Sequence, residues 1–178
     1  MQPFIVILIV IASIIALLLI IAAFLPKKVD IKAATTIDAS IDSVRDFVKI
    51  LDNQRYYSVR VMADPTSKMT YTGTDGTIWA SMSRDSTSNK VWAWTQTIID
   101  MTPLKSITIE IQFDRPMKWT NHNHITMQNT WNQTTVTQNF TWPSPRPFNI
   151  MTAIFLPKLQ SDLQQSMDNL KQHLEHKM

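Results

Sequence analysis

The sequence contains no cysteine and only two glycines in 178 residues. Without cysteine there is no disulfide scaffold, no thiol nucleophile and no cysteine-ligated metal. No Gly-rich phosphate loop is present, and the GxSxG and HExxH motifs are missing as well. No set of nucleophile, base and acid stands out in their place. The sequence therefore offers no support for the common catalytic classes.

Charge is missing from the first 26 residues, because every charged side chain lies from Lys27 onward. The 17 basic and 14 acidic residues are interspersed, and they leave a formal net charge of +3. Nucleic-acid-binding proteins usually carry a basic patch or stripe. We therefore expect no nucleic-acid partner.

A long apolar run occupies residues 4–25, where Ser13 is the single polar side chain. As a helix it would span about 33 Å, enough for the hydrocarbon core of a bilayer. Pro26 would end the helix, and Lys27 and Lys28 would reach the lipid headgroups. This pattern predicts a transmembrane helix.

A cleaved signal peptide is the alternative interpretation of this run. It would need a basic start and a shorter apolar stretch, whereas the chain begins Met1-Gln2-Pro3. We therefore expect a retained anchor with a basic flank at residues 1–28 and a soluble domain at residues 29–178. Lysines follow the run and no basic residue precedes it, so the positive-inside rule places the domain in the cytoplasm.

The soluble part alternates between patterns typical of strands and helices. Ile107, Ile109, Ile111 and Phe113 alternate with polar residues, as in a half-buried strand. Ser40 is a good N-cap for a short helix. The patterns predict helices over 41–51 and 156–174, and strands over 29–37, 59–63, 68–72, 78–84, 91–99, 106–114, 119–127 and 134–142. The fold class is therefore α+β.

Several segments resemble the START-like, or SRPBCC, superfamily of polyketide-cyclase and lipid-transport proteins, in a branch with one N-terminal membrane helix. The matching segments are LPKKVDIKAATTIDAS, Asp64-Pro65, Gly73, Gly76, ITIEIQF, Phe140-Thr141-Trp142 and DLQQSMDNLKQHLE. The resemblance implies the helix-grip fold, a curved antiparallel sheet wrapped on a long C-terminal helix. It covers most of residues 27–175 and concerns the fold rather than an active site.

The resemblance also implies a cavity between the long helix and the sheet, which in relatives holds lipids or other apolar molecules. Its lining here would be Ile107, Ile109, Ile111, Phe113, Leu159, Leu163, Met167 and Leu170. The residues alone are equally typical of a packed core, and apolar stripes usually are core. Both interpretations remain open from the sequence.

Three tryptophans stand where relatives tend to carry glycine: Trp79, Trp92 and Trp94. Trp92 and Trp94 share one face of a predicted strand, and Trp79 lies on its hairpin partner. Pointing inward they would fill the cavity; pointing outward they would form an aromatic contact surface. We favour the outward orientation slightly, because a cavity could hardly hold three indoles.

His122 and His124 share one face of a predicted strand, which is half of what a metal site needs. No Asp or Glu lies between Asp114 and Asp162 to complete it. We therefore expect two solvent-facing histidines, with neither metal nor cofactor.

These patterns lead to two hypotheses of function. The first is a membrane-anchored START-like domain that binds an apolar ligand or lipid without catalysis. The alternative is an accessory subunit of a membrane protein complex, with the anchor and the tryptophan strands as contacts. A cyclase-like enzyme ranks lowest, because only fold analogy supports it.

Overall fold

The computed structural model describes residues 2–85, 93–115 and 118–176. The helices in this part of the chain are α1 (Gln2–Phe24), α2 (Ile41–Val48), the 3-10 helix η1 (Leu51–Tyr56), α3 (Val59–Met62) and α4 (Asn149–His176). The strands are β1 (Lys28–Ile37), β2 (Lys68–Thr72), β3 (Ser81–Asp85), β4 (Trp94–Thr102), β5 (Ser106–Phe113), β6 (Trp119–Thr130) and β7 (Gln133–Pro143).

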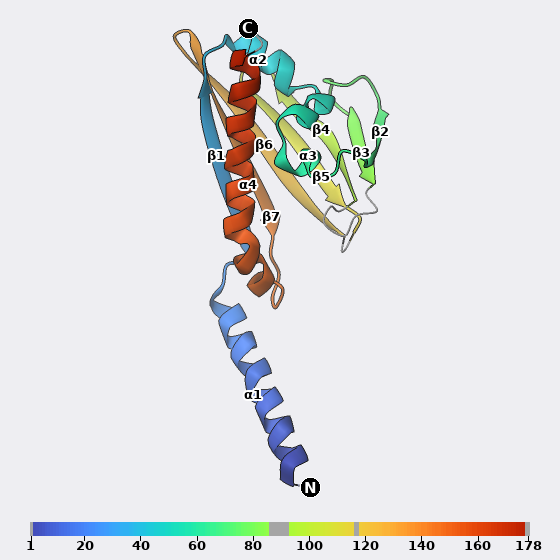
Figure 1. Ribbon diagram of the computed structural model, residues 1–178, viewed down its shortest axis with the longest axis vertical. Helices are drawn as coiled ribbons and strands as arrows, with labels where there is room; N and C mark the ends of the chain where they lie inside the picture. Colours follow the sequence, from blue (N-terminus) through green and yellow to red (C-terminus); the bar gives the residue numbers. More distant parts are fainter. Residues whose placement is uncertain (1, 86–92, 116–117, 177–178) are drawn as a thin grey trace.

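The seven strands form one antiparallel sheet in the order β1-β7-β6-β5-β4-β3-β2. Helix α4 packs across one face of this sheet beside β1, and α2, η1 and α3 lie next to it (Figure 1). The α+β class and the long C-terminal helix on a curved sheet are therefore confirmed. Alternate residues of each strand point toward α4, and we call this the inner face of the sheet.

The inner face and α4 share a single apolar core. Along α4, Leu163, Met167, Leu170 and Leu174 are buried, as the predicted stripe requires. At the edge strand β1, the side-chain amide of Gln160 donates a 2.7 Å hydrogen bond to the carbonyl of Lys32. Exposed strand edges invite pairing with other chains, so α4 both fills the core and covers this edge.

The segment 59–63 was predicted as a strand, and this prediction is wrong. Residues Val59–Met62 form the short helix α3, whose N-terminus is capped by the Ser58 hydroxyl accepting from the amide of Val61 at 3.5 Å. Arg84 donates to the carbonyls of Arg60, at 2.9 Å, and of Asp64. A tertiary contact at the end of α3 thus outweighs the strand propensity of the two valines.

Residues 73–76 form a turn that requires both glycines. Their φ angles are +78° at Gly73 and +81° at Gly76, a region that other residues rarely adopt. A Cβ atom at Gly76 would also lie 2.7 Å from the side chain of Ile50. This turn connects β2 to the segment before β3, which becomes a strand only at Ser81.

Helix α1 extends away from the domain (Figure 1) with its apolar side chains exposed. Residues Pro3–Phe24 are long and apolar enough to cross a membrane, a property that signal sequences share. The last turn of α1 is tied to the start of α4, because the side-chain amide of Asn149 donates to the carbonyls of Ala22 and Leu25, at 2.8 and 3.2 Å.

Candidate functional site

The eight side chains predicted to line a cavity do meet between α4 and the sheet. Six of them are buried members of the core cluster, and Phe113 and Leu159 pack against it half-buried. The structure therefore brings the predicted set together. In this state the side chains form a packed apolar interior.

Amide side chains interrupt this apolar interior, and the sequence analysis missed them. Gln54 of η1 and Gln96 of β4 are buried and exchange two hydrogen bonds, of 3.2 and 2.9 Å. Asn121, Asn123 and Gln138 are also buried, on the inner faces of β6 and β7. The sequence held a signal for two of them. Asn121 and Asn123 alternate along the strand in step with Ile125 and Met127, so all four side chains point to the same, buried face.

The side-chain oxygens of Asn121, Asn123 and Gln138 accept no hydrogen bond from any described residue. The strand register places Asn123 opposite Phe140 on β7, where Gln138 is the next inward residue. A buried polar atom left without a partner costs about 1–3 kcal/mol. Such atoms in a native protein call for an explanation, such as a water or a ligand that supplies the donor.

Arg84 is the one charged residue among the largest fully buried side chains of the described chain, at 1% exposure. Its guanidinium lies 5.0 Å from the ring centre of Trp94, a cation–π contact, in addition to its bonds to two carbonyls. Burial lowers the pKa of Arg84, because the charged form loses hydration. Trp94 in turn lies 6.0 Å from Phe113, measured between ring centres, so the pair connects the core to the end of the sheet.

A cleft of about 450 Å³ lies at this end of the sheet. Its lining residues are Lys68, Thr70, Ser83, Arg84, Asp85, Ala93, Trp94, Thr95, Asp114 and Arg115. Because the strands are antiparallel, β2 and β4 start at the end of the sheet where β1 begins with Lys28, and β3 and β5 finish there. This end of the sheet comes directly after α1. The cleft therefore lies at the α1 end of the sheet and meets the core at Arg84 and Trp94.

None of the eight predicted lining residues contributes to this cleft. Its rim is charged, and Arg115 forms an ion pair with Asp85. The cleft therefore combines one aromatic wall with a polar rim.

The tryptophan prediction needs a correction at Trp94. It is only 7% exposed, because it shares the inward parity of Gln96 and Ile98 on β4. Trp79 is 71% exposed but precedes β3 rather than lying on it, with a φ of +71°. Trp92 lies outside the described residues. Trp79 and Trp94 therefore do not form one outward patch.

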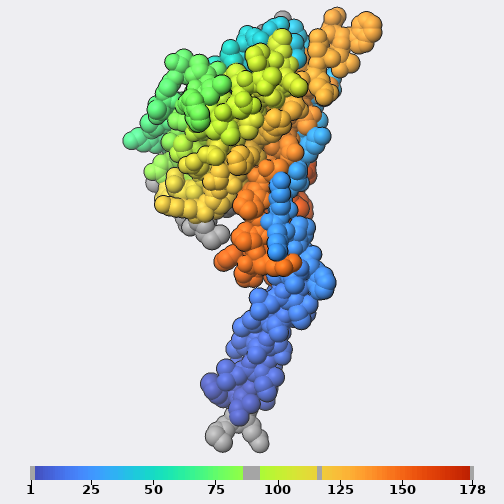
Figure 2. All heavy atoms as spheres, turned by 180° about the vertical axis from the view of Figure 1, so that it is seen from behind, coloured from blue at the N-terminus to red at the C-terminus, as the bar shows by residue number. Residues whose placement is uncertain are grey.

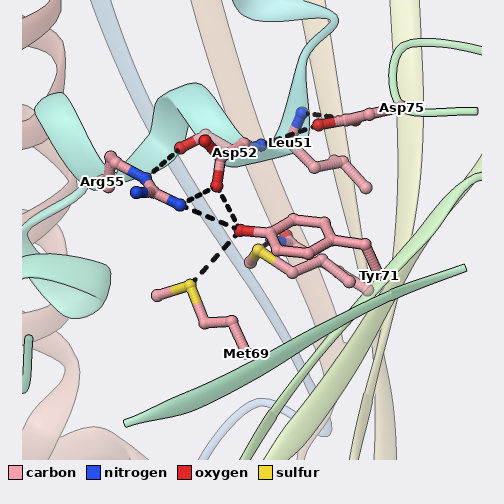
Figure 3. A network of polar contacts seen from close by, with 8 residues as sticks. Leu51, Asp52, Arg55, Met69, Tyr71 and Asp75 are labelled. Carbon is pink, nitrogen blue, oxygen red and sulfur yellow. Dashed lines mark hydrogen bonds and ion pairs between the residues drawn. The ribbon is translucent and has the colours of Figure 1, made fainter. Parts of the chain in front are cut away.

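A second polar cluster joins η1 to β2 (Figure 3). Tyr71 donates to a carboxylate oxygen of Asp52, which also pairs with Arg55. Asp75 accepts from the backbone amides of Leu51 and Asp52, at 2.8 and 3.0 Å, and so caps the start of η1. Burial, followed by the hydrogen bond to Asp52, raises the pKa of Tyr71. The phenol therefore stays protonated at neutral pH and can donate to Asp52. Because these contacts hold η1 against β2, we call the cluster the structural clamp.

The two strand histidines lie on the outer face of β6 and are exposed. His124 shares a 3.0 Å hydrogen bond with the hydroxyl of Thr108, and His122 lies 3.7 Å from a carboxylate oxygen of Glu110. In the described part of the chain, no three His, Asp or Glu side chains gather as metal ligands would.

The chain matches no protein-family model and no curated protein sequence. It is similar in structure to the di-domain ARO/CYC StfQ of the steffimycin biosynthetic pathway (TM-score 0.63, 12% identity, 84% of this chain and 51% of StfQ). It is also similar to the Aha1 dimer protein of Colwellia psychrerythraea (0.56, 15%, 83% and 96%) and to major latex-like protein 151 of Panax ginseng (0.57, 9%, 84% and 99%). At these identities the similarity shows the helix-grip fold alone.

Proposed function

We propose that this protein is a membrane-anchored helix-grip domain that binds an amphipathic, lipid-like ligand without catalysing a reaction. The observation that carries the proposal is the set of unpartnered amide oxygens of Asn121, Asn123 and Gln138 within an apolar interior. Because this interior is packed, an amphipathic ligand would enter it by separating α4 from the sheet, and a hydroxyl or amide group of the ligand would then donate to those oxygens.

The cleft supports this proposal by its position and its lining. It meets the apolar interior at Trp94, and its charged rim suits the polar end of an amphipathic molecule. In the clamp between η1 and β2, Asp52, Arg55 and Tyr71 are engaged with one another. This engagement supports a binding role rather than a catalytic one.

The contacts of α1 support a retained anchor over a removed signal. Arg146 donates to the carbonyls of Ala22, at 3.0 Å, and Ala23, and Asn149 binds the same turn. A removed segment would not be expected to satisfy buried groups of the mature domain. We accordingly assign residues 1–28 as the anchor and 29–178 as the binding domain, on the cytoplasmic side according to the positive-inside rule.

The anchor predicts that the full-length chain stays in the membrane fraction after a carbonate wash, because a span of this length partitions stably into lipid. The measurement is the distribution of the protein between pellet and supernatant. Release into the wash would contradict the anchor, as would N-terminal sequencing that starts near Pro26.

The ligand is tested by native mass spectrometry of the full-length protein extracted in mild detergent. We expect an adduct with the mass of a lipid or another small amphipathic molecule. Replacing Asn123 by leucine removes one acceptor and should weaken binding about tenfold, as the loss of one buried hydrogen bond does. The matched control is Asn129→Leu, on the exposed end of β6, which should retain the ligand.

The same spectra test the alternative of an accessory subunit. This hypothesis is favoured by two exposed tryptophans, Trp79 at 71% and Trp131 at 95%. A mass corresponding to a second protein, with no small molecule bound, would support the subunit and contradict ligand binding.

A further inference from the structure

Apolar side chains are exposed in the first two turns of α4 and at Phe148, the residue directly before the helix. Phe148, Met151, Ile154 and Phe155 are 54%, 53%, 65% and 53% exposed. The spacing of Met151, Ile154 and Phe155 places these three on one face of the helix. Further along α4, from Leu163 onward, the apolar side chains are buried against the sheet. We call the four exposed residues the α4 apolar patch.

This patch lies directly beside the end of α1. Asn149, which is buried between patch residues in the sequence, donates to the carbonyls of Ala22 and Leu25 at 2.8 and 3.2 Å. Figure 1 shows the first turns of α4 next to the point where α1 joins the domain. If α1 crosses a bilayer, the patch therefore stands at the level where the chain leaves the hydrocarbon.

The charges around the patch are basic. Lys27 and Lys28 follow α1, Arg146 precedes the patch, and Lys158 stands one turn beyond it on the same helix face. From residue 115 to residue 161 the sequence has no acidic residue. Lys158 itself is exposed and pairs with Asp162 one turn further along, at 2.6 Å. Apolar residues bordered by lysine and arginine are typical of helices that lie in the interface of an anionic membrane.

We propose that the α4 apolar patch is a second membrane contact, which inserts into the interfacial region of the same bilayer that α1 crosses. This inference rests on the anchor in the proposed function. The occupant is lipid rather than a protein partner, because the patch stands next to the end of α1, where the chain would leave the hydrocarbon, and its basic border matches anionic headgroups. With two contacts, the domain would have a fixed tilt, with the end of the sheet that holds the cleft toward the membrane.

The absence of cysteine allows a direct test, because a single introduced cysteine can carry an environment-sensitive fluorophore. The full-length variant Phe155→Cys is labelled and reconstituted into vesicles of phosphatidylcholine and phosphatidylglycerol. We expect blue-shifted emission and several-fold stronger quenching by lipids brominated on the acyl chain than for Trp131→Cys. Trp131 is 95% exposed and lies in the β6–β7 turn. The strand register places this turn at the end of the sheet opposite Lys28, and Figure 2 shows the turn away from α1.

A third label, at Leu17→Cys within α1, reports the anchor separately. Quenching at Leu17 but not at Phe155 would overturn the second contact and leave the anchor intact. No quenching at either position would overturn both. Quenching at Phe155 that disappears in the double variant Ile154→Glu/Phe155→Cys, with the Trp131 label unchanged, supports insertion of this helix face.

Discussion

Replacing Leu163 by alanine is expected to lower the free energy of unfolding by about 2–5 kcal/mol. Leu163 lies in the middle of the α4 stripe, is 6% exposed and belongs to the core cluster. Truncation removes its contacts with the sheet and leaves a cavity that α4, held along β1, cannot easily close. Each kcal/mol corresponds to roughly 2–4 °C in a domain of this size, so thermal melts of the detergent-solubilised protein should show a clear loss.

The matched control for this substitution is Gln165→Ala. Gln165 is exposed on the other side of α4 and donates only to the side chain of Asn169, at 3.0 Å. Its loss should change stability by no more than about 0.5 kcal/mol. Equal effects at the two positions would mean that α4 packs through a different face.

Replacing Trp94 by alanine is the second large perturbation, with an expected cost of about 3–5 kcal/mol. The indole is buried, contacts Phe113 and covers the guanidinium of Arg84. Its removal would leave a void at the junction of core and cleft and would remove the cation–π contact with Arg84. Melts followed by circular dichroism measure this cost without relying on tryptophan fluorescence.

Trp79→Ala provides the comparison, because Trp79 is 71% exposed. Alanine keeps the same backbone strain at φ +71°, so the change in stability should stay within about 0.5 kcal/mol. If Trp79 contacts a partner, the variant instead alters the assembly seen by size-exclusion chromatography. A tolerated Trp94→Ala together with a destabilising Trp79→Ala would reverse our assignment of the two side chains.

The architecture was predictable because its main elements carry strong periodic patterns. Strand β5 alternates Ile107, Ile109 and Ile111 with polar residues, and α4 repeats leucine and methionine at helical spacing. These patterns arise because one face of each element is buried, so they can be recognised in the local sequence. The short helix α3 was not predictable, since it depends on the contact between Arg84 and the Arg60 carbonyl, 24 positions apart.

Helix α4 is longer than predicted. The apolar repeat predicts a helix only over residues 156–174. The helix instead begins at Asn149 and passes through Pro157. The contacts of Asn149 with α1 favour this earlier start, and they involve a segment more than a hundred residues away.

The candidate site was predictable only in its apolar half. The alternation of apolar and polar residues along a strand predicts which side chains belong to the core. The orientation of Trp94 depends instead on a strand register that the sequence leaves open. The buried amides were missed because asparagine is usually exposed. The shared parity of Asn121 and Asn123 with Ile125 would have identified them.

The connection between α1 and β1 has a consequence for how the domain meets other molecules. Only Leu25, Pro26 and Lys27 separate the two elements, and three residues span at most about 10 Å. With α1 in a bilayer, the domain has no tether with which to search the surrounding solution. Its encounters are confined to a thin layer at the membrane, where partners arrive by lateral diffusion and their effective concentration depends on their density in the plane. Lengthening this connection with a flexible insert would change the rate of those encounters while leaving every contact within the domain intact.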